Sequence, residues 1–414
     1  MNRLRRSGRP AVLARGPGVI RYGAAGLLNA LGTGVFYPYA LLVFQEVARL
    51  PLRTVGIVLT VAAFAALPAM SLVGRAVDRA GPRTVLVVAS LSRAAAFVGY
   101  VALPGVLPFL LISVLVAIAN RAEQVASPAL AVALAPDGQA GRWLALSRAV
   151  FNAGIGGGAL IASAFVGHGR TGFLVLTLAN AVSFLATALL HGSLPAGRSS
   201  AESGTADGHR KPDPPWRTPR FLRVSLITAT LWAVALAVEA ALPVVVIVQL
   251  GQPAWVAGTL FAVNTALLAL CHVPVGAALT RHDPWRVLAV GALLHGTLAV
   301  AFLVVERYAV ALLLVLLLVG MVGYTLGELV AAQAGLVLLT ELPPPARRGR
   351  HLAFHQMLVG AAGALVPVVV TALLARWPAV LWWGVLALSA LAAGSARTVR
   401  GTTRQAPPGR TSAG

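Results

Sequence analysis

The chain has 414 residues, of which 58% are hydrophobic and only 11% are charged, and its mean hydropathy is +0.82. Soluble domains carry about a quarter charged residues, so this composition excludes an ordinary cytosolic enzyme and is typical of an integral membrane protein. The formal charge of +21 does not indicate a nucleic-acid partner, because the basic residues are scattered between apolar runs. The single cysteine, Cys271, excludes a disulfide scaffold and a cysteine-based zinc site.

A membrane-spanning helix needs about 20 apolar residues, because backbone polar groups cannot stay unpaired in hydrocarbon. Twelve such runs are present, six on either side of a polar stretch that is rich in Ser, Gly, Pro and Arg. We therefore predict an all-α membrane protein with twelve transmembrane helices. The predicted spans are 18–44, 54–73, 84–103, 107–134, 143–166 and 172–191, then 221–248, 255–279, 286–305, 308–339, 351–375 and 378–396.

These spans divide the chain into two bundles of six helices. We expect an N-terminal bundle at 1–191, a linker at 192–220, a C-terminal bundle at 221–400 and a disordered tail at 401–414. The linker is expected to be solvated, because its composition offers no apolar surface to bury.

The arginines and lysines indicate the orientation in the membrane. Of the 33 basic residues, 26 lie in the termini, the linker and the loops on one side of the predicted spans, and five lie on the other side. Cytoplasmic loops retain Lys and Arg, so the linker and both termini are predicted to be cytoplasmic in a multi-pass protein of the plasma membrane. The same residues would attract anionic lipid headgroups.

The two halves repeat one another at a shift of about 205 residues. A repeat of six helices with the same orientation places a pseudo-two-fold axis along the membrane normal. Transporters built in this way bind substrate near the midplane and rock one bundle against the other, so the repeat indicates alternating access. The matched pairs include Pro38 with Pro243, Arg93 with His295, and Glu123 with Glu328.

The loop between the second and third spans reads GRAVDRAGPR, from Gly74 to Arg83. This pattern resembles the cytoplasmic loop signature of the major facilitator superfamily. Gly74 would allow close helix approach, and Gly81 a tight turn. Asp78 would pair with a basic group or cap a helix, while Arg79 and Arg83 would bridge to the other bundle and latch one conformation. The alternative is that the arginines only fix the topology.

The fourth span contains Arg121 and, three residues later, Gln124. This spacing is similar to a motif in the fourth helix of proton-driven drug antiporters, although Val125 stands where that motif has glycine. Because a lone arginine is costly in a bilayer, Arg121 should face a cavity or find a partner, and bonds to backbone carbonyls are the alternative.

The fifth span contains a run of glycines, which should permit tight packing against a neighbouring helix. The antiporter version of this helix also carries a Gly-Pro pair, and no proline is present here. The resemblance to drug antiporters implies proton-coupled efflux of small amphipathic molecules. Because the proline is missing, nutrient uptake by symport or uniport stays open. The glycines are Gly154, Gly156, Gly157 and Gly158.

Three acids, Glu123, Glu239 and Glu328, lie well within spans. A carboxyl group balanced between burial and a nearby arginine can bind and release protons, which proton coupling requires. In the superfamily, spans one, four, seven and ten line the central cavity, so the resemblance implies that all three acids face it. Each acid could instead be a neutral interface residue. Further cavity candidates are Asn29, Tyr37, Asn152 and Tyr324.

Two basic residues, Arg93 and His295, fall on spans three and nine, which are peripheral in this fold, and we expect them to be structural or lipid-facing. A membrane enzyme or a non-transporting sensor is the remaining alternative. The histidines are scattered, and neither a metal-type spacing nor a phosphate-binding loop is apparent, so we expect no enzyme activity, cofactor or metal. The expected partners are a small-molecule substrate, protons and the lipid bilayer, for a protein that is monomeric.

Overall fold

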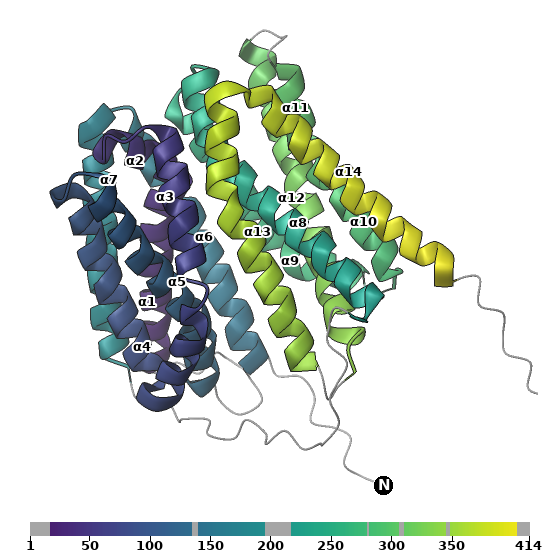
Figure 1. The fold of residues 1–414 in the computed structure, drawn as a ribbon, viewed down its shortest axis with the longest axis horizontal. Helices are drawn as coiled ribbons and strands as arrows, with labels where there is room; N and C mark the ends of the chain where they lie inside the picture. Colours follow the sequence, from purple (N-terminus) through teal and green to yellow (C-terminus); the bar gives the residue numbers. More distant parts are fainter. Residues whose placement is uncertain are drawn as a thin grey trace, which may run out of the picture.

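A computed structural model describes residues 17–134, 140–194, 217–279, 281–305, 310–344 and 348–403. Within these ranges all regular secondary structure is helical, and the helices form two bundles that lie side by side (Figure 1). Most of the expected linker, at 195–216, and most of the expected tail, at 404–414, lie outside the described residues.

The N-terminal bundle begins with a broken helix. α1 (Pro17–Phe36) passes through the 3-10 turn η1 (Tyr37–Tyr39) into α2 (Ala40–Val47). The break falls at Pro38, which has no backbone N–H to continue the helical hydrogen bonding. The other helices of this bundle are α3 (Leu52–Ala65), α4 (Ala69–Ala102), α5 (Val106–Leu134), α6 (Ala140–Val166) and α7 (Gly169–Gly192).

The C-terminal bundle begins with a similar break. α8 (Pro219–Pro243) passes into the π-helical segment η3 (Val244–Gln249) at Pro243, the repeat partner of Pro38. The two prolines therefore interrupt the first helix of each bundle at corresponding places. The remaining helices are α9 (Ala254–Leu279), α10 (Pro284–His295), α11 (Thr297–Val305), α12 (Val310–Glu341), α13 (Arg348–Arg376) and α14 (Pro378–Thr403).

The predicted fold class is confirmed. Eleven helices of the described chain are long and apolar enough to cross a membrane, and the shorter apolar helix α3 supplies the twelfth span. The predicted second span at 54–73 is interrupted near Pro68, so that α3 ends and α4 begins within it. α4 then turns at Gly81 and continues as the third span.

For the description of packing, the linker end is the end of the molecule where α7 ends and α8 begins, and the far end is the opposite one. At the far end, one apolar cluster contains side chains from both bundles, among them Phe44, Phe97 and Trp382. Toward the linker end, three smaller clusters each belong to a single bundle, and they include Val73, Leu86 and Phe221. The apolar core therefore joins the bundles at the far end and divides between them toward the linker end.

Two pairs of helices carry most of the packing between the bundles, and α8 also contacts η1 and α2. α3 packs against α13, and α6 packs against α9. The Thr60 hydroxyl of α3 accepts a 3.1 Å hydrogen bond from the backbone N–H of Val368 in α13. Gly156 of α6 lies so close to Thr265 of α9 that a Cβ at position 156 would be 2.9 Å from the Thr265 Cβ atom.

Candidate functional site

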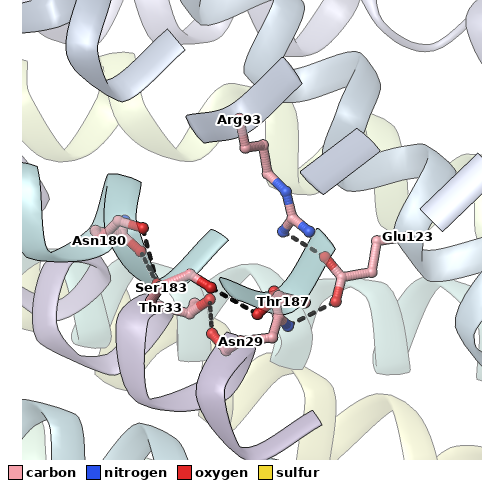
Figure 2. Close-up of polar contacts among 7 residues, drawn as sticks. All are labelled: Asn29, Thr33, Arg93, Glu123, Asn180, Ser183 and Thr187. Atoms are coloured by element: carbon pink, nitrogen blue, oxygen red, sulfur yellow. Dashed lines mark hydrogen bonds and ion pairs between the residues drawn. The ribbon is translucent and has the colours of Figure 1, made fainter. Parts of the chain in front are cut away.

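The three predicted acids occupy two separate sites. Glu123 of α5 points into the N-terminal bundle, where it forms an ion pair with Arg93 of α4 (Figure 2). The Asn29 amide of α1 donates a 2.6 Å hydrogen bond to the Glu123 Oε1 atom. The resemblance implied that Glu123 faces the cavity between the bundles, whereas in the structure its two carboxylate oxygens engage partners from its own bundle.

Arg93 is 3% exposed, so of the two roles expected for it, structural and lipid-facing, its burial fits the structural one. Besides Glu123, its guanidinium lies over the Phe184 ring of α7, 4.2 Å from the ring centre. A charged group in these surroundings is costly unless it is paired, and the ion pair and the aromatic face together supply the compensation. Arg93, Glu123 and Asn29 therefore tie α4, α5 and α1 together.

A seam of polar side chains follows α7 beside this ion pair (Figure 2). Its members recur every three or four residues, which places them on one face of the helix. Their hydroxyl groups are satisfied within α7: Ser183 donates to the Asn180 carbonyl at 2.8 Å, and Thr187 to the Ser183 carbonyl at 2.7 Å. The seam consists of Thr177, Asn180, Ser183, Thr187 and His191.

Glu239 of α8 and Glu328 of α12 form the second site, the carboxyl pair. The charge of Glu328 acts on the Glu239 carboxyl group. The charge of Glu239 also acts on Tyr37, which belongs to η1 of the other bundle, and both acids act on Tyr324. The carboxyl pair thus lies where the two bundles meet, and among the described residues neither acid has an ion-pair partner.

One polar side chain that the sequence analysis did not select contacts this pair. Asn264 of α9 donates to the Glu328 Oε2 atom at 3.3 Å and to the Thr325 hydroxyl at 3.0 Å. Asn264 is an isolated amide within the apolar span of α9, and that isolation was the signal that could have identified it. Its bonds hold the Glu328 carboxyl group in a fixed orientation.

Tyr324 also contacts His295. The two rings lie 4.6 Å apart, and His295 is 1% exposed. Of the two roles expected for His295, structural and lipid-facing, its burial fits the structural one, as it does for its repeat partner. Asn152 of α6 is half-buried.

Arg121 points away from Glu123, toward the other bundle. Its guanidinium donates to the Gln124 side-chain oxygen at 3.3 Å, which joins the two residues of the antiporter-like motif. Its Nη2 atom lies 3.7 Å from the place that a Cβ at Gly360 of α13 would occupy. Arg121 thus carries its charge to the boundary between the bundles.

The loop signature adopts a turn in which its residues have different environments. Gly81 has φ 78° and ψ 154°, a conformation that is essentially restricted to glycine. Arg83 donates to the Gly192 carbonyl of its own bundle, rather than bridging to the other bundle as expected. Among the described residues, no atom outside Gly74's own helical turn lies within 4 Å of where its Cβ would be, so the expected close approach to another helix is not seen in this conformation. Asp78 and Arg79 are exposed, and neither forms an ion pair with a described residue.

The glycines of α6 lie in contact with helices of both bundles. A Cβ at Gly154 would be 2.4 Å from the Ala30 Cβ atom, and one at Gly158 would be 2.4 Å from the Leu31 carbonyl oxygen. Both distances are far below van der Waals contact, so only glycine allows this approach of α6 to α1. Gly157 also faces Leu31, whereas Gly156 faces α9.

The chemistry available at these sites is that of ionisable groups and hydrogen bonds. Within the described ranges no group of three or more His, Cys, Asp or Glu side chains is placed to hold a metal ion. The sites therefore offer carboxyl and amide groups that can form hydrogen bonds.

Comparisons with known proteins agree with this architecture. The family model described as Major Facilitator Superfamily matches residues 23–333. A crystal structure of a mutant of the nucleoside transporter NupG superposes with a TM-score of 0.75 at 12% identity, covering 92% of this chain and 99% of that one. No curated protein sequence matches the chain.

Two further solved structures have the same fold. The inward open xylose transporter XylE from E. coli superposes with a TM-score of 0.71 at 16% identity, covering 95% of this chain and 97% of that one. A bacterial homologue of the iron transporter ferroportin in its inward-facing state superposes with a TM-score of 0.69 at 16% identity, covering 92% and 98%. With a family model that spans most of its twelve helices, the chain belongs to the Major Facilitator Superfamily.

Proposed function

We propose that the protein is a proton-coupled secondary transporter of the plasma membrane that exports small amphipathic molecules by alternating access. Membership of the superfamily supports transport as the activity. The observation that carries the proposed coupling is the carboxyl pair, Glu239 and Glu328, which lies at the junction of the bundles without an ion-pair partner among the described residues.

The chemistry of the carboxyl pair suits proton exchange. Two neighbouring carboxylates repel when both are ionised, so a proton or a cationic group bound between them relieves the repulsion. Protons and a cationic or amphipathic substrate then compete for one place. Asn264 holds Glu328 in position, and Tyr37 adds an aromatic surface for the apolar part of a substrate.

The division of the apolar core supports alternating access. The shared cluster closes the far end, while the clusters near the linker end belong to separate bundles. The arginine distribution supports a cytoplasmic linker end, and in that orientation this conformation would receive substrate from the cytoplasm. Transport would require the two bundles to separate at the far end and to come together at the linker end, where the loop signature would hold them.

Export rather than uptake is favoured by the Arg121 and Gln124 pair, which resembles the antiporter motif and faces the boundary between the bundles. The available energy is sufficient. One proton moving through 100 mV releases about 2.3 kcal/mol, which sustains a concentration ratio of about fifty. Uptake by symport is the second candidate, because α6 lacks the proline of the antiporter helix.

The proposal is tested by flux in proteoliposomes with an imposed pH gradient and a panel of organic cations, antibiotics and sugars. We expect substrate to move opposite to the proton gradient, and Glu239→Gln and Glu328→Gln each to abolish the dependence on that gradient. Glu341→Gln, an exposed acid at the end of the same α12 helix, serves as the matched control and should transport normally.

Two results would contradict the proposal. Movement of substrate in the same direction as protons would replace export by uptake. Gradient-driven flux that persists in both glutamine variants would place proton coupling outside the carboxyl pair.

A further inference from the structure

A groove on the outer surface of the C-terminal bundle has features that transport does not use. It lies between α10 and α14, has a volume of about 440 Å³, and is lined by Trp285, Arg286, Ala289, Val290, Ala396 and Arg397. One wall is therefore the first turns of α10, and the other is the last part of α14. The two helices pack directly against each other beneath the groove.

Two of the lining residues are exposed arginines at the same depth. Arg286 lies in the first turn of its membrane span, Pro284–Val304, and Arg397 lies in the last turn of its span, Pro378–Thr398. Both span ends are at the linker end of the molecule. Lipid headgroups meet the protein at the ends of its spans, so the two guanidinium groups flank the groove at headgroup depth.

The charges around the groove are predominantly positive. Arg223 of α8 donates to the Thr398 hydroxyl at 3.2 Å, which adds a third cation beside Arg397. The acid nearest in sequence is Asp283, whose carboxylate accepts a 3.1 Å hydrogen bond from the Trp285 N–H and caps the start of α10. Three arginines outnumber this one carboxylate, so the groove favours an anion.

The rest of the lining is apolar and continues toward the middle of the membrane. Ala289 and Val290 lie one turn further along α10, and the Val290 side chain is 45% exposed. Trp285 stands at the arginine end, where an indole ring suits the boundary between headgroups and acyl chains. A ligand that fills the groove needs an anionic head and an apolar tail.

We propose that the groove between α10 and α14 is a binding site for one anionic phospholipid, whose phosphate lies between Arg286 and Arg397 and whose acyl chain lies along Ala289 and Val290. Guanidinium groups bind phosphate through two parallel N–H···O bonds, which a lysine cannot reproduce. Basic pockets between membrane helices on the cytoplasmic side bind anionic headgroups by the same chemistry. A zwitterionic lipid of the same chain length lacks the net charge that the arginines recognise.

The test uses the full-length protein in neutral detergent, with native mass spectrometry to count retained lipid. Phosphatidylglycerol and phosphatidylcholine of equal chain length are titrated separately, and inorganic phosphate is a third arm. We expect one phosphatidylglycerol to be retained preferentially. Its affinity should fall about fivefold for each arginine removed in Arg286→Gln and Arg397→Gln, and by a smaller factor in Arg286→Lys.

Two further variants separate a seated lipid from a diffuse surface charge. Val290→Trp fills the apolar part of the groove and leaves both arginines in place, and we expect it to weaken retention of phosphatidylglycerol. Arg170→Gln removes an exposed arginine at the far end, at the start of α7, and should leave retention unchanged.

Each other outcome overturns the proposal. Equal retention of the two lipids would show that headgroup charge does not determine binding. Unchanged retention in the double variant of Arg286 and Arg397 would show that the arginines do not bind the lipid. Competition by inorganic phosphate at equal concentration would show a site for free anions rather than for lipid. Unfolding of a variant is detected by size-exclusion chromatography, and the lysine variant then supplies the comparison.

Discussion

The ion pair between Arg93 and Glu123 provides the sharpest test of how the N-terminal bundle is held together. Arg93 is 3% exposed, and the Glu123 side chain is 19% exposed. Removing one member of a buried pair costs about 3–5 kcal/mol, because the other charge is left uncompensated. Glu123→Met should reach this range, since it strands the guanidinium and also removes the acceptor of the Asn29 amide.

Arg93→Met should cost less, about 1–3 kcal/mol. A stranded carboxylate can be neutralised by taking up a proton, whereas a guanidinium remains charged at all accessible pH values. The double variant, with methionine at both positions, should recover most of the loss in Glu123→Met, because apolar side chains replace the pair without leaving a charge and only the Asn29 amide still lacks its acceptor.

The measurement is reversible unfolding in mixed micelles with increasing sodium dodecyl sulfate, read as the free energy of unfolding. Glu46→Met, at an exposed position near the end of α2, is the control. The reasoning is refuted when both single variants lie within about 0.5 kcal/mol of the control, which is the scatter of ordinary surface substitutions, or when the double variant is less stable than either single one.

The other predictions concern packing, the loop signature and the closed far end. Gly158→Val should destabilise the protein by several kcal/mol, measured by the same unfolding assay, because its side chain would meet the α1 backbone. Gly23→Ala should be tolerated, because no described atom outside its own helical turn lies within 4 Å of the new Cβ. Asp78→Asn should slow transport in proteoliposomes about tenfold with unchanged yield of folded protein, and full activity would remove its latch role. Thr60→Cys and Val368→Cys, combined in a protein without other cysteines, should form a disulfide on oxidation. Transport should stop in the oxidised protein and return when the disulfide is reduced. Transport that continues in the cross-linked form would contradict opening of the far end.

Hydropathy was sufficient to predict the membrane spans of this fold. Their number and approximate boundaries follow from the length that a bilayer requires, and the breaks in α1 and α8 occur at the repeat-related Pro38 and Pro243. The interruption near Pro68 was not predicted, since the run 54–73 is apolar throughout and hydropathy alone does not locate a bend.

The sites were harder to predict, because the rotation of each helix is set by its neighbours. Glu123 and Glu328 are repeat partners, yet Glu123 is paired with Arg93 inside its bundle, and Glu328 lies with Glu239 between the bundles. Arg93 and its repeat partner, His295, explain part of this difference. Arg93 offers a permanent charge that attracts Glu123, whereas His295 packs against the Tyr324 ring. A linear sequence does not contain these three-dimensional pairings.

The loop signature illustrates a second limit. Its glycine turn at Gly81 follows from the residue type, while the partners of Asp78 and Arg83 depend on which conformation the bundles adopt. Arg83 contacts its own bundle in the present state, in which the apolar clusters at the linker end are separate. We expect the signature to exchange partners when the linker end closes.

The most direct test of the central claim is substrate-driven proton movement. Coupling is reciprocal, so a compound that the protein exchanges for protons must move protons when it is supplied alone as a gradient. Proteoliposomes loaded with a pH-sensitive dye and no initial pH gradient would be given each member of the substrate panel. The account predicts that a transported compound changes the internal pH with the unsubstituted protein and the Glu341→Gln control, and leaves it unchanged with Glu239→Gln and Glu328→Gln. Transport of a compound by the unsubstituted protein without any change of internal pH would contradict it.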